Sequence, residues 1–219
     1  YEAHGAEGIA ALQRTIASIH AIAPDVPVIL DAKRGDIGNT NSGYVEMAFD
    51  YLGADAITVS PYAGKEEGLE PFFECKNKGI IVLCRTSNKG AGDLQDLPVR
   101  VPLDVFRHIE TLLEREIPEG TVSLYQYVAY LVSQEWNHNN NCALVVGAQY
   151  PEELKQVRKI VGDMPILVPG LGFQQKDVPL SEQVRLVVEN GKDSRGRGFI
   201  PNSARGIIRA PDPRAATME

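Results

Sequence analysis

Short, almost wholly apolar runs alternate along the chain with longer amphipathic stretches. The apolar runs predict strands at 26–30, 56–59, 79–83, 142–146, 165–168 and 198–201. All but the last lack the polar alternation of a half-exposed strand, which is typical of parallel strands covered on both faces. The amphipathic stretches predict helices at 6–22, 40–52, 103–116, 121–136, 151–161 and 181–190.

Apolar residues within the helical stretches recur every three or four positions. Along 6–22 they fall on one face, at Ile9, Leu12, Ile16 and Ile19. The stretch at 151–161 opens with Pro151 at a first-turn position, and Gly53 and Gly191 follow two other stretches as typical helix stops. These signals predict where the helices begin and end.

The unbroken alternation of strands and helices predicts an α/β fold with a parallel sheet. We find no linker or domain boundary, so residues 1–219 are expected to form a single domain. A (β/α)8 TIM barrel takes about 250 residues, and six units preceded by a helix predict such a barrel without its first two strands. The alternative is an open doubly wound sheet. Its Gly-rich first turn is absent from the sequence, which favours the barrel.

Composition narrows the class of protein. The 219 residues include 22 Lys and Arg against 29 Asp and Glu, a formal net charge of −7, and 43% are hydrophobic. These values are ordinary for a globular protein and exclude a disordered chain or a collagen. An acidic chain is a poor candidate for bulk nucleic-acid binding. No apolar stretch approaches the roughly 20 residues that cross a bilayer, and the start lacks a secretory signal, so we expect no membrane partner.

The three cysteines are an odd number and lie far apart in the sequence. Cys84 and Cys142 fall in apolar, strand-like runs, whereas Cys75 does not. This usage fits reduced thiols in a cytoplasmic protein better than a disulfide framework or a zinc site.

Charged residues cluster where the first predicted strand ends. Asp31 and Lys33 are two positions apart, so on a regular strand they share a face. Asp36 follows in the loop, and Thr40 opens the next helix. Active sites of barrels and open α/β sheets lie at the carboxyl ends of strands. A lysine between two carboxylates suits a general acid, although the residues alone equally allow a surface ion pair followed by a helix cap.

The complete string resembles a known family. Residues 31–40 read D-A-K-R-G-D-I-G-N-T, which resembles the active-site signature D-x-K-x-x-D-I-G-N-T of the orotidine 5'-monophosphate decarboxylases. Further segments resemble motifs of that family in the same order, at 86–88, 146–153, 168–174 and 202–207. The resemblance extends over essentially the whole chain. It implies a barrel enzyme that converts orotidine 5'-monophosphate to uridine 5'-monophosphate.

The resemblance implies a role for each residue of the string. Asp31 would lie against the substrate carboxylate and disfavour the bound ground state. Lys33 would stabilise the carbanion left at C6 of the pyrimidine and protonate it. Asp36, Ile37 and Thr40 would reach into the site of a neighbouring subunit, which implies a homodimer with shared active sites.

The later segments are implied to bind the rest of the nucleotide. Ser87 would hydrogen-bond the amide edge of the pyrimidine. Gln174 and Arg205 would hold the phosphate, with Pro169 and Gly170 beside it and the N–H groups of 170–172 assisting. A helix N-terminus with an arginine suits a phosphate, and barrels often bind phosphate after their last two strands. No metal or organic cofactor is implied.

The sequence departs from the family pattern in three places, the mildest being Leu171 where the family has Val or Ile. The family has a further lysine on the second strand of its barrel and a ribose-binding aspartate on the first. Both residues would lie before Tyr1. From the roughly 30 residues of a βα unit, we expect roughly 40–60 residues to be missing at the amino end, and we expect the chain alone to fold poorly and be inactive. Secondly, Phe173, Gln175 and Lys176 replace Ala and Gly-Gly around Gln174, which stiffens the phosphate loop.

Two other functions stay open at this point. A sugar-phosphate decarboxylase or synthase of the same suprafamily shares D-x-K-x-x-D and typically needs Mg²⁺, but the string 37–40 argues against it. A non-catalytic fragment is supported only by the missing lysine. Among the remaining features, the four histidines lack metal-ligand spacing, 88–93 is expected to be a mobile flap over the base, and 192–197 a solvated turn.

Overall fold

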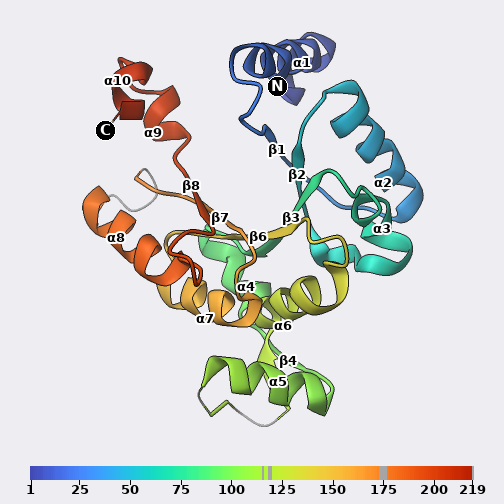
Figure 1. Ribbon diagram of the computed structural model, residues 1–219, viewed down its shortest axis with the longest axis vertical. Helices are drawn as coiled ribbons and strands as arrows, with labels where there is room; N and C mark the ends of the chain where they lie inside the picture. The colour runs from blue at the N-terminus through green and yellow to red at the C-terminus, as the bar shows by residue number, and fades with distance from the viewer. Residues whose placement is uncertain (115, 118–119, 173–176, 219) are drawn as a thin grey trace. The chain divides into compact units, whose positions relative to one another are not determined.

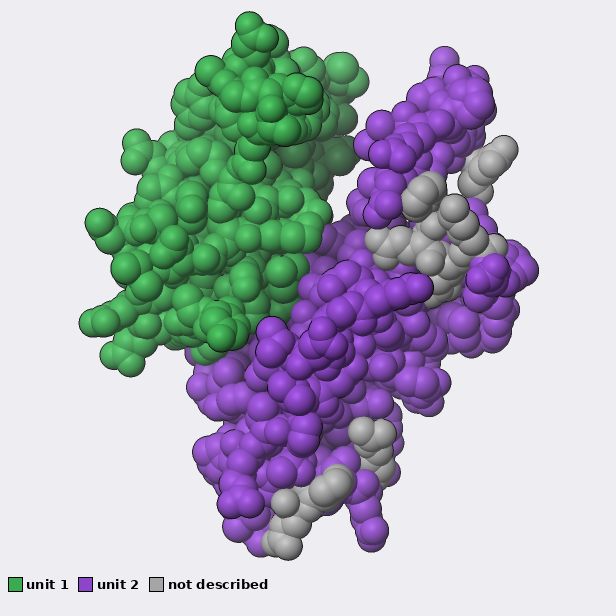
Figure 2. All heavy atoms as spheres, turned by 180° about the vertical axis from the view of Figure 1, so that it is seen from behind, with its two compact units in different colours: residues 1–83, 136–142 green, residues 84–135, 143–219 purple. Residues whose placement is uncertain are grey.

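A computed structural model describes residues 1–114, 116–117, 120–172 and 177–218. The chain divides into two compact units (Figure 2). Unit 1 comprises Tyr1–Leu83 and Trp136–Cys142, and unit 2 comprises Cys84–Glu135 and Ala143–Glu219.

Six parallel strands form the main sheet, as the sequence predicts, so the fold is α/β (Figure 1). Unit 1 orders its strands β1-β2-β3, and unit 2 orders its strands β6-β7-β8. Their bounds are β1 Ile29–Arg34, β2 Ala56–Val59, β3 Gly79–Arg85, β6 Cys142–Val146, β7 Ile166–Pro169 and β8 Phe199–Asn202. Every residue of β2 and of β6 is buried, which explains why these runs are apolar apart from Thr58.

Ten α-helical segments are found among the described residues. They are α1 Gly5–Ile22, α2 Gly38–Val45, α3 Glu70–Phe73, α4 Gly92–Gln95, α5 Leu103–Leu113, α6 Leu124–Tyr130, α7 Pro151–Val161, α8 Leu180–Gly191, α9 Arg205–Ile208 and α10 Pro213–Met218. The π-helical segments Glu46–Tyr51 and Leu131–Trp136 continue α2 and α6. The predicted helices at 6–22, 103–116, 151–161 and 181–190 are thereby confirmed to within a few residues.

The first strand differs from the prediction. It was expected at 26–30, but β1 begins at Ile29, because a turn precedes it and leaves Val26 54% exposed. The strand continues past Leu30 to Arg34, since Arg34 still pairs with Val59 of β2. Asp31, Lys33 and Arg34 therefore lie within the strand and not after it, whereas Asp36 follows the strand.

The predicted helix at 121–136 also begins later than expected. Its first residues form β5 (Thr121–Ser123), which pairs antiparallel with β4 (Pro98–Arg100). Helix α6 starts at Leu124, where the Gln126 Oε1 accepts the Ser123 N–H at 2.8 Å. Figure 1 shows the β4 ribbon and α5 projecting away from the parallel strands of the same unit.

The apolar face predicted for α1 is only partly buried. Ile16 is 2% exposed, whereas Ile19 is 37% exposed. Ile16 and His20 of α1 line a pocket together with residues 50–53. The exposure of Ile19 shows that packing does not cover the whole face.

The cysteines confirm the sequence prediction of core thiols. Cys84 and Cys142 are buried, Cys75 is half-buried, and all three are free. Burial raises the pKa of the Cys142 thiol to about 12 and raises the pKa of Cys84 as well. These thiols are therefore neutral near pH 7. Within the described part of the chain, we find no helix with both the length and the apolar character of a membrane span.

Arg158 of α7 connects the ends of three elements in unit 2. Its guanidinium donates to the carbonyl oxygens of Gly162, Met164, Gly191 and Gly198 at 2.5, 2.6, 2.9 and 2.7 Å. These carbonyls lie at the end of α7, at the end of α8 and just before β8, where helix ends leave acceptors unsatisfied. Burial lowers the pKa of Arg158, although arginine stays protonated at any ordinary pH. One side chain thus fixes the start of β8, the strand that leads to Arg205.

Replacing Arg158 by Met should destabilise the protein by about 3 kcal/mol, because several carbonyls lose a charged donor at once. The measurement is the free energy of unfolding from urea denaturation. Arg185→Met on α8 is the matched control, since within the described part of the chain Arg185 pairs with Glu182 and Glu189 on the same exposed helix surface. Its urea midpoint should stay close to that of the unchanged protein. Equal effects of the two substitutions would contradict the assigned role of Arg158.

Candidate active site

The carboxyl-terminal part of β1 carries a bulge. Leu30 pairs with Ile57 of β2 and Arg34 pairs with Val59, so residues 31–33 of β1 face the single residue Thr58. Within the bulge, Lys33 adopts a left-handed backbone with φ 50°. This conformation costs about 1 kcal/mol for a residue with a Cβ, and bulges re-aim side chains next to active sites.

Asp31 and Lys33 are in contact in this bulge. Lys33 Nζ donates to Asp31 Oδ2 at 2.6 Å, and the Thr58 hydroxyl donates to Asp31 Oδ1 at 2.8 Å. The sequence prediction that the two side chains lie together is confirmed, but regular strand alternation is not the reason. The bulge and the left-handed Lys33 bring them together.

The Asp31–Lys33 pair contributes little to stability. The two side chains are 59% and 52% exposed in unit 1, and exposed ion pairs are worth at most about 1 kcal/mol because water screens them. Lys33 keeps an unfavourable backbone conformation although its ion pair stabilises the fold little. Such local strain is typical of a functional site.

The loop after β1 is fixed by a fully buried asparagine. Asn41 accepts the Asp36 N–H at 3.0 Å and donates to the Asp36 carbonyl at 2.6 Å and to the Gly68 carbonyl at 2.9 Å. Asp36 and Thr40 are exposed, and Ile37 is 66% exposed. Helix α2 begins at Gly38, so Thr40 lies in its first turn and does not open it as predicted. Asn41 therefore anchors a loop that presents polar and apolar side chains outward.

In unit 2, Ser87 lies against the end of β6. A Cβ added to Gly147 would come within 2.7 Å of the Ser87 Cα, so only glycine allows this approach. The Gly147 N–H donates to the Arg85 carbonyl at 2.8 Å, which continues the pairing beyond the strands. The resemblance motif V-G-A at 146–148 thus has a physical reason, since it makes room for the 86–88 loop.

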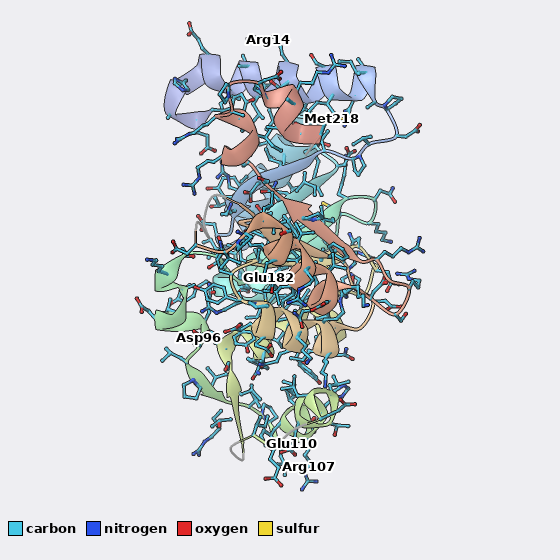
Figure 3. The ribbon with its side chains drawn as sticks, turned by 90° about the vertical axis from the view of Figure 1, so that its left-hand side faces the viewer. Arg14, Asp96, Arg107, Glu110, Glu182 and Met218 are labelled. Atoms are coloured by element: carbon cyan, nitrogen blue, oxygen red, sulfur yellow. The ribbon has the colours of Figure 1, made fainter. Side chains whose placement is uncertain are left out.

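Arg85 connects this loop to the following helical turn. It is 3% exposed, and its Nη2 donates to Asp96 Oδ2 at 2.9 Å. Its Cζ lies 3.8 Å from the centre of the Tyr150 ring, within cation–π range. Gln95 adds a hydrogen bond to the Thr86 N–H at 2.9 Å. These hydrogen bonds anchor the far end of the segment, on which Figure 3 labels Asp96. Movement of residues 88–93 stays a prediction.

The loop after β7 is glycine-rich and left-handed. Gly170 and Gly172 have φ angles of 101° and 80°, which only glycine adopts without strain. The Gly172 N–H donates to Gln183 Oε1 at 2.8 Å, and Gln183 Nε2 donates to the Val178 carbonyl at 2.7 Å. The buried Gln183 therefore links Gly172 to Val178. Gln174, predicted to bind phosphate, lies between these two residues and outside the described residues.

The loops after β7 and β8 lie side by side. Pro169 pairs with Asn202 at the ends of these strands, and a Cβ on Gly172 would lie 3.9 Å from the Ser203 Oγ. Arg205 is exposed and begins α9 directly after this turn. The structure thus places the loop of Pro169 and Gly170 beside the turn that precedes Arg205, while the binding of a phosphate by these residues stays a prediction.

The predicted residues fall into two sets. Residues 31–40 belong to unit 1, and Ser87 together with the loops after β7 and β8 belongs to unit 2. Sequence reasoning missed the supporting residues Thr58, Asn41 and Gln183. A polar residue inside an apolar run was the only available signal, and it applies to Thr58 alone.

His20 and the turn at 192–197, to which the sequence assigned no chemistry, have structural contacts. His20 Nε2 lies 2.9 Å from Asp55 Oδ2. Asp193 accepts the N–H groups of Arg195 and Arg197 at 2.9 Å each, which closes the predicted turn at 192–197. The described residues contain no cluster of three or more His, Cys, Asp or Glu side chains placed to hold a metal.

Comparison with known proteins shows the family to which this chain belongs. Residues 1–219 match the orotidine 5'-phosphate decarboxylase / HUMPS family. Orotidine 5'-phosphate decarboxylase of Aromatoleum aromaticum is 45% identical over 199 residues, which are 91% of this chain and 64% of that relative. The chain therefore spans slightly less than two thirds of the length of this curated relative.

Two solved structures from Leishmania donovani are similar in fold. OMP decarboxylase has a TM-score of 0.77 at 39% identity, covering 98% of this chain and 72% of that chain. UMP synthase has a TM-score of 0.80 at 39% identity, covering 98% of this chain and 41% of that chain. Since the family match extends from the first residue to the last and includes the string in β1, this chain belongs to the orotidine 5'-phosphate decarboxylase / HUMPS family.

Proposed function

We propose that this protein decarboxylates orotidine 5'-monophosphate to uridine 5'-monophosphate in pyrimidine synthesis, without a metal or organic cofactor. The Asp31–Lys33 contact of 2.6 Å inside the β1 bulge carries the proposal. It lies within the signature string 31–40, in a chain whose curated relatives are named orotidine 5'-phosphate decarboxylase.

Lys33 supplies the charge and the proton of the reaction. The bond from C6 to the carboxylate breaks, CO2 leaves, and the electron pair stays on C6. Lys33 stabilises this pair and then donates a proton to C6, becoming an amine that regains a proton from water. An ammonium has three N–H donors, and Asp31 holds one of them, so the others can face the substrate. Asp31 beside the departing carboxylate disfavours the ground state.

Unit 2 supplies the groups that bind the ends of the nucleotide. Ser87 hydrogen-bonds the pyrimidine amide edge from a position set by Gly147. The left-handed glycines after Pro169 shape a loop of the kind that binds anions. The Gly172 N–H, expected from the sequence to assist, is already bound by Gln183 and is not available to the phosphate. Gln174 and Arg205 add side-chain donors to the phosphate.

We propose that two copies of the chain share their active sites. Asp36, Ile37 and Thr40 reach the neighbouring site, and their exposure in the isolated chain supports this, since Ile37 is 66% exposed next to a loop anchored by Asn41. An apolar side chain presented in this way fits burial against a second copy.

The six strands belong to a (β/α)8 barrel in one domain, with two further units on the amino-terminal side. The six parallel strands and the 64% coverage of the curated relative support this arrangement. The further lysine and the ribose-binding aspartate of the family come from those units. The buried neutral thiols and the pyrimidine-pathway relatives fit a cytoplasmic enzyme.

In the protein extended at its amino end by two βα units, Lys33→Ala should lower kcat/KM for orotidine 5'-monophosphate by a factor on the order of 10³ or more, because the proton donor and the charge at C6 are lost together. Loss of orotate absorbance in the ultraviolet measures it. Lys155→Ala, on the exposed side of α7, is the matched control and should keep full activity. Retained activity in Lys33→Ala would contradict the proposed mechanism. Loss of wild-type activity with a chelator would favour the Mg²⁺-dependent alternative.

Extending the chain at its amino end by two βα units should produce decarboxylation that the chain alone lacks. The reason is that closing a barrel pairs strand edges that otherwise stay open. Activity and the urea midpoint are compared for the two lengths. Full turnover by the chain alone would overturn the proposed barrel. An inactive but folded and dimeric extended protein would overturn the proposed reaction.

In the extended protein, Gly147→Ala should raise KM about tenfold, because the new methyl group displaces the Ser87 loop that is proposed to contact the pyrimidine. Gly43→Ala is the matched control, since a Cβ there would meet nothing within 4 Å. Steady-state kinetics on both variants checks the expectation. An unchanged KM in Gly147→Ala would argue against contact between Ser87 and the base.

A further inference from the structure

Thr58 is a buried polar residue in the middle of an apolar strand. It is 0% exposed, and its neighbours Ile57 and Val59 are 0% exposed as well. A buried hydroxyl is costly unless it is hydrogen-bonded. A residue of this kind is therefore retained for what its hydroxyl contacts.

The Thr58 hydroxyl makes two hydrogen bonds, both to the bulge of β1. It accepts the Lys33 N–H at 2.9 Å and donates to Asp31 Oδ1 at 2.8 Å. A hydroxyl has one proton, so donation to the carboxylate and acceptance from the N–H fix its orientation. The single hydroxyl thus joins the backbone of one residue of the string to the side chain of another.

The bulge explains why a side chain is needed at this place. Three residues of β1 face one residue of β2, so the ladder cannot supply a carbonyl for every N–H group. The Thr58 hydroxyl takes the place of that carbonyl for Lys33, whose backbone is left-handed. It also occupies one oxygen of Asp31, while Lys33 Nζ occupies the other.

We propose that Thr58 is the positioning residue of the reaction, an inference that rests on the proposed decarboxylation. Its hydroxyl holds the Asp31 carboxylate in one rotamer and the Lys33 backbone in one conformation. Lys33 Nζ is thereby kept where it meets C6. Thr58 itself touches no substrate, and it acts through Asp31 and Lys33. A displacement of about 1 Å in such a pair is enough to slow a reaction about 100-fold.

The test compares Thr58→Val with Thr58→Ser in the active, extended protein. Valine keeps the shape and removes the hydroxyl, whereas serine keeps the hydroxyl and removes the methyl group. Thr58→Val should lower kcat by about 10- to 100-fold with KM within about twofold, because base and phosphate contacts come from other loops. Thr58→Ser should restore kcat to within about threefold of the unchanged protein. Thr111→Val, on the exposed surface of α5, should change neither constant.

Amide hydrogen exchange at Lys33 gives a readout that does not depend on activity. Exchange should be at least about tenfold faster in Thr58→Val and remain slow in Thr58→Ser, because the acceptor of this N–H is lost only in the first. An equal loss of kcat in both variants would assign Thr58 a packing role and overturn the proposal. Unchanged kcat in Thr58→Val would overturn it as well. If the unchanged protein is inactive while exchange follows this pattern, the proposed reaction fails and the hydrogen-bond assignment stands.

Discussion

The bulge between β1 and β2 is the constraint on which the proposed catalytic residues Asp31 and Lys33 depend. Strand β2 is buried at every position, so it cannot shift to accommodate a neighbour. Residues 31–33 must therefore fit opposite Thr58, with Lys33 in a left-handed conformation. This arrangement places an ammonium against a carboxylate in an exposed position, where the pair adds little stability and is available for chemistry.

A common construction supports three of the loops that carry site residues. In each, one fully or almost fully buried polar side chain from a neighbouring position makes hydrogen bonds to the loop: Thr58 for the bulge, Asn41 for the Asp36 loop and Gln183 for the glycine loop after β7. The residues proposed to react with or bind the substrate are themselves mostly exposed. Rigid support beneath accessible groups is what a site needs to hold its geometry without burying its own charges.

Much of the fold could be predicted from the sequence, because many of its elements follow from patterns among neighbouring residues. The strands β2 and β6 and the helix α7 have the bounds that the apolar runs and Pro151 predicted. The errors occurred where tertiary pairing overrides local pattern, at β1, which continues through charged residues, and at β5, which takes the first residues of a predicted helix. Pairing with a neighbouring strand decides both, and a sequence does not display its neighbours.

The sequence by itself determined the α/β class and the family, and it singled out Asp31, Lys33 and Asp36 as candidate site residues. The reason is that strand periodicity and a contiguous motif are properties of adjacent residues. Only the tertiary structure decided how these residues meet. Thr58 lies 25 positions from Lys33, and Asn41 reaches Gly68 across 27 positions. Hydrogen bonds over such separations depend on strand register and burial, which arise when the chain packs and leave no pattern among neighbouring residues.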